Sequence, residues 1–299
     1  MDTSTTLVKS YYDTAAQSCE EQYERAAITD VSMEYPANYF RLQLLLNSFA
    51  AKGVKRVIEV GVGEGTPLAT LTRAGLDAWG FDISEEMVAR SRRRMQEIGK
   101  NPDQVGWGDV QDPISYAHLL REGLFDGLLA MGVMPHVHNE RAVLENMKSM
   151  VRPGGSVFVE FRNSLFSLFT FNRYTLDFIL NDLLRDVSPT VKAAVEADLK
   201  PRLRVDMPKM RTSGADGEGL GYDAILSKFH NPLEVVDLFN SAGFKDVKLL
   251  WYHYHPAMPY LEGSMAEAFR SDAARLEHET SGWRGLFLCS AFVVEAIKG

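Results

Sequence analysis

The sequence predicts an α/β protein built on a doubly wound, mostly parallel sheet with helices on both faces. Between residues 55 and 160, short apolar segments alternate with amphipathic segments, as strands alternate with helices in such folds. Three alternating glycines, Gly61, Gly63 and Gly65, follow the first apolar segment. Because glycine has no side chain, a ligand can approach the backbone of this loop closely. The 299 residues suffice for one large domain with insertions.

The composition narrows the class of protein. The chain is 45% apolar and 24% charged, as ordinary globular proteins are. Its net charge of −8 argues against a nucleic-acid partner, because phosphate backbones are bound through excess Lys and Arg. Cys19 and Cys289 match no disulfide or zinc spacing, and we predict no metal site. No apolar run approaches the ~20 residues of a membrane span and residues 1–6 are polar, so we expect a soluble, cytoplasmic protein.

The elements follow from the spacing of apolar residues. Residues 1–53 are predicted to form an N-terminal helical cap, because residues 5–28 and 35–49 have helical spacing. Residues 54–163 are predicted to form the core. Its expected strands are 57–60, 77–81, 105–107, 125–131 and 156–161, and its expected helices are 66–71, 85–98 and 141–151.

Two insertions interrupt the second half of the chain. Residues 164–230 begin with a strongly apolar and aromatic stretch, which predicts a helical lid over the pocket or a subunit contact. This insertion also holds five cations within residues 200–211, which form either a solvated edge or a site for an anionic group. A glycine-rich loop follows at 213–221. Residues 231–299 are expected to complete the sheet. They would supply a helix at 232–242, a sixth parallel strand at 245–252, a helical insertion near 257–282 and a closing strand at 286–297.

The glycine loop discriminates between cofactors. A dinucleotide fingerprint has the spacing G-x-G-x-x-G, whereas residues 59–65 read Glu-Val-Gly-Val-Gly-Glu-Gly. This segment resembles the first motif of class I S-adenosylmethionine-dependent methyltransferases, and the resemblance extends over about residues 35–160. It implies a Rossmann-like methyltransferase fold of seven strands, the last antiparallel, with S-adenosyl-L-methionine as cofactor. We count Glu59 with Gly61, Gly63 and Gly65 among the cofactor-binding residues, since the resemblance places the loop against the methionine part.

The end of the second strand is the expected ribose site. Asp82 lies 21 residues after Gly61, close to the ~20 expected of an acidic residue in a nucleotide-binding unit. A carboxylate can accept hydrogen bonds from both ribose hydroxyls, and Ile83 can cover the adenine face. Asp82 could instead cap the next helix, but Ser84 already fits that role with two acidic residues after it.

Further cofactor residues come from the resemblance. Asp109 matches the family position that accepts from the adenine amino group, with the Val110 backbone alongside. Met131 precedes residues 132–138, which resemble the family segment that passes the sulfonium. The family's N-terminal helices often close over the cofactor, where Tyr12 and Arg41 would serve. A core aromatic residue and a surface cation remain the alternative for this pair.

The substrate is expected at the carboxyl ends of strands four, five and six, because ligands bind beyond those ends in such sheets. The candidate catalytic residues there are His136, Arg162, His253, Tyr254 and His255. On a regular strand, His253 and His255 would share one face, with Tyr252 and Tyr254 on the other. His136 could alternatively only bond the backbone and hold its loop, and the two later histidines form at most a weak metal motif.

The expected function is methyl transfer from S-adenosylmethionine to an oxygen or nitrogen of a small or medium-sized acceptor. A natural-product, sugar or phosphorylated metabolite fits the aromatic insertion and the basic stretch. Three alternatives stay open: a methyltransferase acting on RNA or protein, a nicotinamide-dependent oxidoreductase, and a non-catalytic cofactor-binding protein. The sequence leaves the oligomeric state open.

Overall fold

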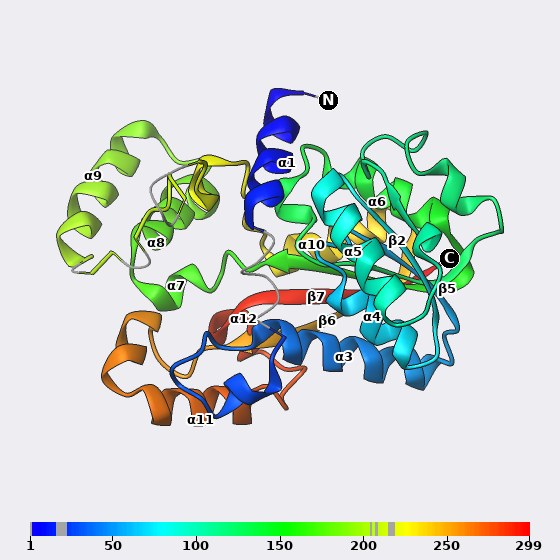
Figure 1. Cartoon of the computed structure of the whole chain (residues 1–299). Coiled ribbons are helices and arrows are strands. Elements are labelled where there is room, and N and C mark those ends of the chain that lie inside the picture. Colours follow the sequence, from blue (N-terminus) through cyan, green and yellow to red (C-terminus); the bar gives the residue numbers. More distant parts are fainter. Residues whose placement is uncertain (1, 16–22, 204, 207–208, 215–218) are drawn as a thin grey trace.

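The computed structural model describes residues 2–15, 23–203, 205–206, 209–214 and 219–299 of the chain (Figure 1). Its centre is a seven-stranded sheet of order β3-β2-β1-β4-β5-β7-β6, in which β7 runs antiparallel to both neighbours. The strands are β1 Arg56–Val60, β2 Asp77–Asp82, β3 Val105–Trp107, β4 Phe125–Ala130, β5 Val151–Arg162, β6 Phe244–Tyr254 and β7 Cys289–Lys298. The predicted doubly wound, mostly parallel sheet with an antiparallel last strand is therefore confirmed.

The strand order reverses between β1 and β4. From β1 the chain winds outward through β2 and β3, whereas β4 pairs with the other side of β1 and the chain continues to β5. Two neighbouring loops thus leave the carboxyl edge of the sheet in opposite directions, which opens a crevice above β1 and β4. This crevice is where a ligand site is expected.

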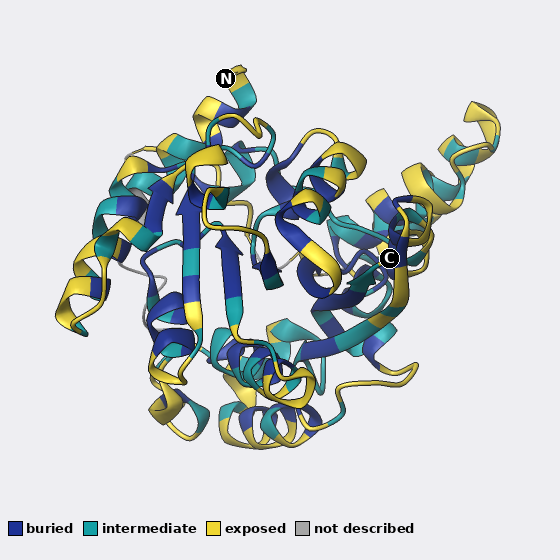
Figure 2. Cartoon of the chain, turned by 90° about the vertical axis from the view of Figure 1, so that its right-hand side faces the viewer, coloured by how far each residue is buried: buried dark blue, intermediate teal, exposed yellow. Residues whose placement is uncertain are grey.

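Helices cover both faces of the sheet through separate apolar clusters. On one face lie α3 Ala37–Lys52, α4 Thr66–Arg73 and α5 Glu85–Glu97, whose Phe49, Leu68 and Met95 are buried in one cluster. On the other face, α6 Glu140–Met150 and α10 Pro232–Ser241 contribute to a second cluster. Figure 2 shows the strands buried between helices whose outward sides are exposed. Burial on both faces explains why the core strands read as nearly continuous apolar runs.

Short helices complete the described chain. Those labelled in Figure 1 are α1 Thr3–Ala15, α7 Ser167–Thr170, α8 Arg173–Asp177, α9 Pro189–Leu199, α11 Ala266–Leu276 and α12 Gly285–Leu288. A π-helix spans Phe178–Leu183. Turns of 3-10 helix occur at Arg25–Ile28, Pro102–Gln104, Ala117–Leu120, Met134–His136, Lys200–Arg202, Tyr222–Ala224 and Pro259–Ser264. Among the described helices, none combines the length and the apolar character needed to cross a bilayer.

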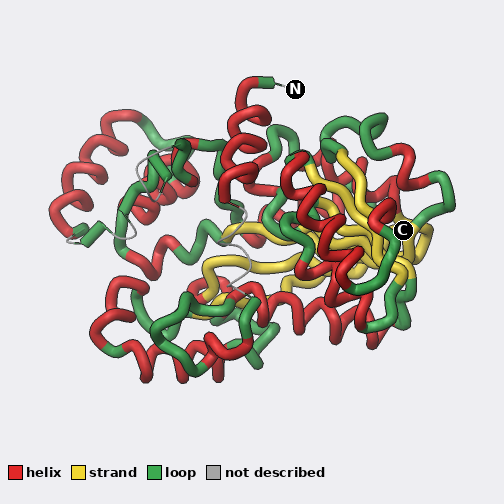
Figure 3. The backbone as a smooth tube through the Cα atoms, viewed as in Figure 1, coloured by secondary structure: helices red, strands yellow, loops and turns green. Residues whose placement is uncertain are grey.

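The two insertions form helical lobes at one side of the sheet. The helices α7 to α9 make one lobe and α11 lies in the other, while α1 stands between the first lobe and the core (Figures 1 and 3). The predicted helical insertion after the fifth strand is confirmed. In the expected helical insertion near 257–282, the chain forms the 3-10 turn Pro259–Ser264 and then α11, which are separated by Met265. The cation Arg204 and part of the glycine-rich loop lie outside the described residues.

The predicted alternation at the end of β6 is only half correct. His253 and His255 do lie together, with ring centroids 4.7 Å apart. Tyr252 and Tyr254, however, do not share the opposite face. His253 has a left-handed backbone with φ 59°, which breaks the two-residue period and turns its ring beside that of Tyr252. Tyr254 therefore packs in the cluster of the other face.

The buried carboxyl group of Glu277 holds this irregular strand end. Its Oε2 accepts a hydrogen bond from the His253 N–H at 3.1 Å, and its Oε1 accepts from the Tyr254 N–H at 2.9 Å. The Tyr35 hydroxyl donates to Oε1 at 3.0 Å, so the segment before α3 is fastened to the same group. Burial raises the pKa of Glu277 to about 7, and the three hydrogen bonds oppose that rise.

This pKa predicts an unusual pH dependence of stability. The folded state retains the Glu277 proton up to a pKa of about 7, against 4.5 for an ordinary Glu, so stability falls as pH rises between these values. The loss amounts to about 3 kcal/mol by linkage. Urea unfolding of the wild type and Glu277→Gln at several pH values should show this fall only in the wild type. Glu267→Gln, an exposed change on α11, serves as control, and parallel curves for wild type and Glu277→Gln would contradict the assignment.

Candidate active site

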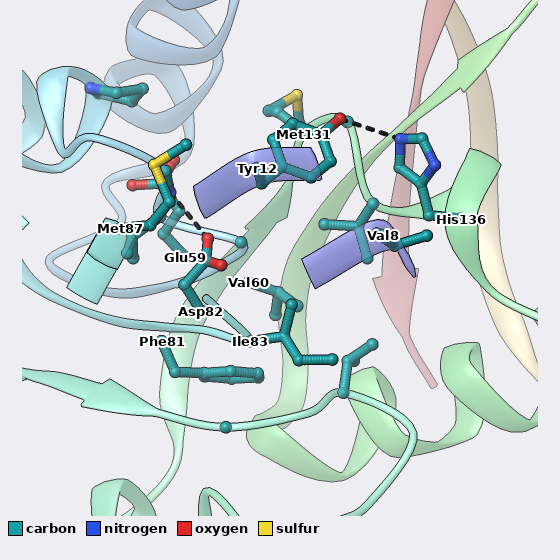
Figure 4. A pocket seen from close by; sticks show the side chains of 18 of the residues that line it. Val8, Tyr12, Glu59, Val60, Phe81, Asp82, Ile83, Met87, Met131 and His136 are labelled. Atoms are coloured by element: carbon teal, nitrogen blue, oxygen red, sulfur yellow. Dashed lines mark hydrogen bonds between the residues drawn. The ribbon is translucent and has the colours of Figure 1, made fainter. Parts of the chain in front are cut away.

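A cavity of about 310 Å³ lies at the crevice above β1 and β4. Figure 4 shows Glu59, Asp82 and Met87 toward one end of it and Tyr12 and His136 toward the other. The structure brings most of the sequence-predicted site residues to its wall: Tyr12, Arg41, Glu59, Gly61, Gly63, Asp82, Ile83, Asp109, Val110, Met131 and His136. These residues come from α1, α3, the ends of β1 and β2, and the loops after β1, β2, β3 and β4.

The glycine loop requires glycine at two positions for two reasons. Gly61 has φ 75°, and a Cβ there would lie only 2.7 Å from the Val133 side chain. Gly63 has φ 55°, and a Cβ there would meet no atom within 4 Å, so its backbone faces open space in the cavity. A ligand can therefore contact the main chain at Gly63 directly. This loop is a cradle that a side chain would fill.

Gly65 has a different place from the one expected. It does not line the cavity but caps the start of α4 with φ 93°. A Cβ on Gly65 would lie 2.7 to 3.0 Å from Ser91 of α5. The absence of a side chain at Gly65 thus serves the close packing of α4 on α5, and a ligand gains access through Gly61 and Gly63.

The Asp82 carboxylate joins the end of β2 to the glycine loop. Its Oδ2 accepts a hydrogen bond from the Gly63 N–H at 2.9 Å, and its Oδ1 accepts from the Ser84 N–H at 2.9 Å. Burial raises the pKa of Asp82, and these backbone donors oppose the rise. Ser84 itself caps α5, as predicted, by accepting from the Met87 N–H at 3.1 Å. Asp82 is therefore released from capping and faces the cavity.

Glu59 is a buried carboxyl group with spare bonding capacity. It is 1% exposed, and its Oε2 has no hydrogen-bond partner among the described residues. Burial raises the pKa of Glu59 well above its usual value, while the Arg41 guanidinium lowers it. An unsatisfied buried carboxyl oxygen on a cavity wall favours a ligand that brings a hydrogen-bond donor or a positive charge.

Arg41 belongs to a buried network that the sequence analysis missed. Its Nη1 lies 2.5 Å from Oε2 of Glu160, and its Nη2 donates to the Tyr23 hydroxyl at 3.0 Å. Glu160 also accepts from the Gly132 N–H at 2.8 Å and from the Tyr252 hydroxyl at 2.6 Å. The signal was present, because Glu160 is a lone acid inside the apolar run of β5. Its partners are far away in sequence and only the fold reveals them.

The wall after β3 is held by local hydrogen bonds. Asp109 Oδ1 accepts from the Gln111 N–H at 2.9 Å, and the Asp109 N–H donates to the Ser115 hydroxyl at 2.9 Å. The Ile83 carbonyl accepts from the indole of Trp107 at 2.9 Å, which joins this loop to the end of β2. The cavity wall at Ile83, Asp109 and Val110 is thus one connected surface.

His136 presents a defined lone pair to the cavity. Its Nδ1 lies 2.6 Å from the Leu226 carbonyl oxygen, which can only accept, so Nδ1 carries the proton. Its Nε2 is therefore an acceptor and receives the Tyr12 hydroxyl at 3.0 Å (Figure 4). The Tyr222 hydroxyl lies 3.5 Å from the same Nε2. Burial lowers the pKa of His136 to about 4, so the ring is neutral at pH 7.

The helix α1 covers the cavity with one face. Thr5, Val8 and Tyr12, spaced three and four residues apart, all line it. Just beyond Tyr12, Asp13 accepts a hydrogen bond from the Ser84 hydroxyl, and at the start of the chain Asp2 pairs with His138 at 3.1 Å. Both ends of α1 are therefore attached to loops of the core. The sequence analysis singled out only Tyr12, although the helical spacing also includes Thr5 and Val8.

Four candidate catalytic residues lie outside this cavity. Arg162 ends β5 and donates to the Ser227 hydroxyl at 2.8 Å. His253, Tyr254 and His255 belong to the irregular end of β6, where the His255 ring packs 4.7 Å from that of Phe166. The expected convergence of three strand ends is wrong for β6, because β7 lies between β5 and β6. In the part of the chain that the structure describes, no three His, Cys, Asp or Glu residues are grouped so as to hold a metal.

Comparisons with known proteins give the family. A family model described as a methyltransferase domain matches residues 35–249. The ubiquinone biosynthesis O-methyltransferase of Methylococcus capsulatus is 23% identical over 206 residues, covering 66% of this chain and 78% of the relative. The enzyme of the same name from Aromatoleum aromaticum is 28% identical over 138 residues, covering 46% of this chain and 57% of that relative. The chain therefore spans less than two thirds of this second relative.

Solved structures agree on the fold. Magnesium protoporphyrin IX methyltransferase from Synechocystis PCC 6803 with bound SAH superposes with a TM-score of 0.53 at 14% identity, over 99% of this chain and 100% of that one. The same enzyme with bound SAM gives a TM-score of 0.52 at 14% identity, over 100% and 99% of the two chains. The family match excludes the nicotinamide-dependent oxidoreductase. The chain belongs to the methyltransferase-domain family and is an S-adenosylmethionine-dependent methyltransferase.

Proposed function

We propose that this enzyme methylates a hydroxyl oxygen of a small-molecule acceptor, with His136 as the proton acceptor. One observation carries the proposal: the hydrogen-bonded pair of His136 Nε2 and the Tyr12 hydroxyl lines the same cavity as the glycine loop, Asp82 and Glu59. The groups suited to the methyl donor and those suited to proton removal therefore occupy opposite ends of one site.

The residues at the first end fit S-adenosylmethionine. The open backbone at Gly63 leaves room for the methionine part, and the unpaired Oε2 of Glu59 suits its ammonium group. Asp82 would accept from the ribose hydroxyls, and Asp109 with the Val110 backbone would face the adenine. When bound, S-adenosylmethionine supplies a methyl group already activated on a sulfonium sulfur. The protein then has to orient the acceptor, exclude water and take up a proton.

His136 is oriented for the proton step. The Leu226 carbonyl holds the proton on Nδ1, so Nε2 is the only ring atom that can accept another. A hydroxyl acceptor would pass its proton to Nε2, either directly or through the Tyr12 hydroxyl that already bonds it. The imidazolium formed would keep its Nδ1–H bond to Leu226 and gain an Nε2–H donor. The helix α1 excludes water from this end of the site.

Oxygen is the acceptor atom that this arrangement favours. A hydroxyl group gains from a base when it attacks, whereas an amine that is already neutral needs none. The two relatives described above carry the name O-methyltransferase. The net charge of −8 favours a small molecule over RNA, the macromolecular alternative.

The ribose assignment predicts a loss of donor affinity. Asp82→Ala should weaken S-adenosylmethionine binding by about 1 to 3 kcal/mol, because buried hydroxyls would lose their acceptor. The matched control is Asp77→Ala at the exposed opposite end of the same strand, which should bind as the wild type does. Calorimetric titration of the wild type, Asp82→Ala and Asp77→Ala with S-adenosylmethionine measures these affinities. Equal affinity of Asp82→Ala and wild type would overturn the ribose assignment.

The proton-acceptor assignment predicts a change in turnover. His136→Ala should lower kcat by about 10² or more while leaving donor affinity nearly intact, since a general base contributes on that scale. Tyr12→Phe should show a smaller loss, because Nε2 remains. His278→Ala is the matched control, because its side chain is exposed and lies outside the cavity. Single-turnover rates measure the effect on methyl transfer, and titrations with S-adenosylmethionine measure the effect on donor affinity. Full activity of His136→Ala would exclude His136 as the proton acceptor.

The pH profile gives an independent test of the same residue. Only neutral His136 can accept a proton, and its pKa of about 4 keeps it neutral throughout the physiological range. We therefore expect kcat/KM to lose activity on the acid side near pH 4, with no loss from this group between pH 5 and 8. An acid limb near pH 6.5, the ordinary value for His, would show that His136 is less buried during catalysis than in this structure.

A further inference from the structure

A second cavity, of about 470 Å³, lies in the first helical lobe. Helix α8, the π-helix after it, Met210 and the segment from Asp223 to Phe229 contribute to its wall. Its volume falls in the range of about 300 to 1,000 Å³ that is usual for small-molecule sites. Most of its lining is apolar or aromatic: Tyr174, Leu176, Leu180, Met210, Ile225 and Phe229. The rings of Tyr174 and Phe229 lie 5.0 Å apart and give the cavity an aromatic wall.

Arg162 is half-buried and lies beside the second cavity, in contact with two residues of its wall. Its Nη1 donates to the Ser227 hydroxyl at 2.8 Å, and its guanidinium carbon lies 4.2 Å from the ring centre of Phe229. Both partners line the second cavity. On its other side the guanidinium lies 5.0 Å from the ring centre of Tyr222, whose hydroxyl is 3.5 Å from His136 Nε2. One aromatic ring therefore separates Arg162 from the proposed proton acceptor.

Arg162 differs from the other cations around the second cavity. Arg173 pairs with Asp206 at 3.1 Å, and Arg211 pairs with Asp223 at 3.7 Å. Among the described residues, no carboxylate lies within ion-pair distance of Arg162. Its charge instead lies against two aromatic rings, those of Tyr222 and Phe229, at the end of a core strand. An aromatic clamp fixes the guanidinium without neutralising it, which leaves its charge for a ligand.

We propose that the second cavity binds the body of the methyl acceptor and that Arg162 binds a carboxylate on it. The acceptor would thus be a hydroxylated aromatic or apolar carboxylic acid; this inference rests on the proposed function. The planar guanidinium matches a carboxylate with two parallel hydrogen bonds. The wall also holds the acids Asp177 and Asp223, and its cation Arg173 is already paired with Asp206. A carboxylate brings one negative charge and needs only Arg162, whereas a phosphate dianion would bring a second charge near these acids.

Tyr222 would be the partition between the two parts of the site. Its ring centroid lies 5.7 Å from that of Tyr11 on α1 and 5.6 Å from that of His136, so the ring stands at the boundary between the lobe and the core. An acceptor anchored at Arg162 on one side of this ring would direct its hydroxyl toward His136 on the other. The lobe therefore selects the acceptor, and the core binds the methyl donor.

The test uses three ligands that differ only in the charge of one group: 3-phenylpropionate, 3-phenylpropan-1-ol and 3-phenylpropylamine. Each is titrated calorimetrically into the full-length protein, with and without S-adenosylhomocysteine. We expect the acid to bind about 10- to 100-fold more tightly than the alcohol, as hydrogen bonds to a charged group provide. Failure of the acid to bind, equal binding of acid and alcohol, or preference for the amine would each overturn the proposal.

Variants assign the effect to Arg162. Arg162→Met keeps the apolar stem and should abolish the preference for the acid, whereas Arg162→Lys should keep part of it. The matched control is Arg211→Met, which removes a paired cation 5.1 Å from the same Tyr222 ring and should keep the full preference. A preference that survives in Arg162→Met would also overturn the proposal.

The proposed function is read out separately. Affinity for S-adenosylmethionine should be the same in wild type and Arg162→Met, which shows that the variant is folded. The three ligands bind without a methyl donor. The test of the carboxylate site can therefore fail while S-adenosylmethionine still binds, and S-adenosylmethionine binding can fail while the carboxylate still binds. Transfer of methyl groups to neutral hydroxyl compounds as fast as to their carboxylated counterparts would leave the proposed function intact and reject the acceptor class.

Discussion

The active site depends on the two hydrogen bonds that the Asp82 carboxylate accepts from the Gly63 and Ser84 N–H groups. They join the end of β2 to the glycine loop after β1 and to the start of α5. The Gly61 and Val62 N–H groups also donate to the Phe81 carbonyl, so the end of β2 holds this loop, with its positive φ values, at several points. The Asp82 oxygens face the cavity, so the group that shapes the binding site is also placed to bind.

The buried ionisable groups differ between the two ends of the active site. Glu59 has an unsatisfied oxygen at the donor end, whereas Glu160 is saturated by Arg41, Tyr252 and the Gly132 N–H. At the opposite end His136 is neutral because it is buried. A cationic ligand would therefore be drawn to Glu59, and the proton acceptor stays ready at the other end. Burial of unpaired groups is costly, which is why they are confined to places that a ligand covers.

Two helical segments outside the core enclose the reaction. Helix α1 covers the donor cavity, and the lobe after β5 brings Leu226 and Tyr222 to His136. The lobe thus fixes the tautomer of a residue that the core supplies. Because the core and the lobe have separate roles, the sheet and glycine loop can bind the same cofactor while the lobe varies with the acceptor.

The sequence alone determined the alternation of strands and helices, the glycine loop, the Ser84 cap and the place of Asp82, because each depends on neighbours within a few residues. Only the tertiary structure decided which candidate histidine lies in the cavity. The contact of Tyr12 with His136 spans 124 positions and that of His136 with Leu226 spans 90, and no local pattern encodes such pairs. The insertion of β7 between β5 and β6 likewise removed His253 and His255 from the cavity. Local periodicity reveals elements, whereas a site is formed by contacts that exist only once the chain has folded.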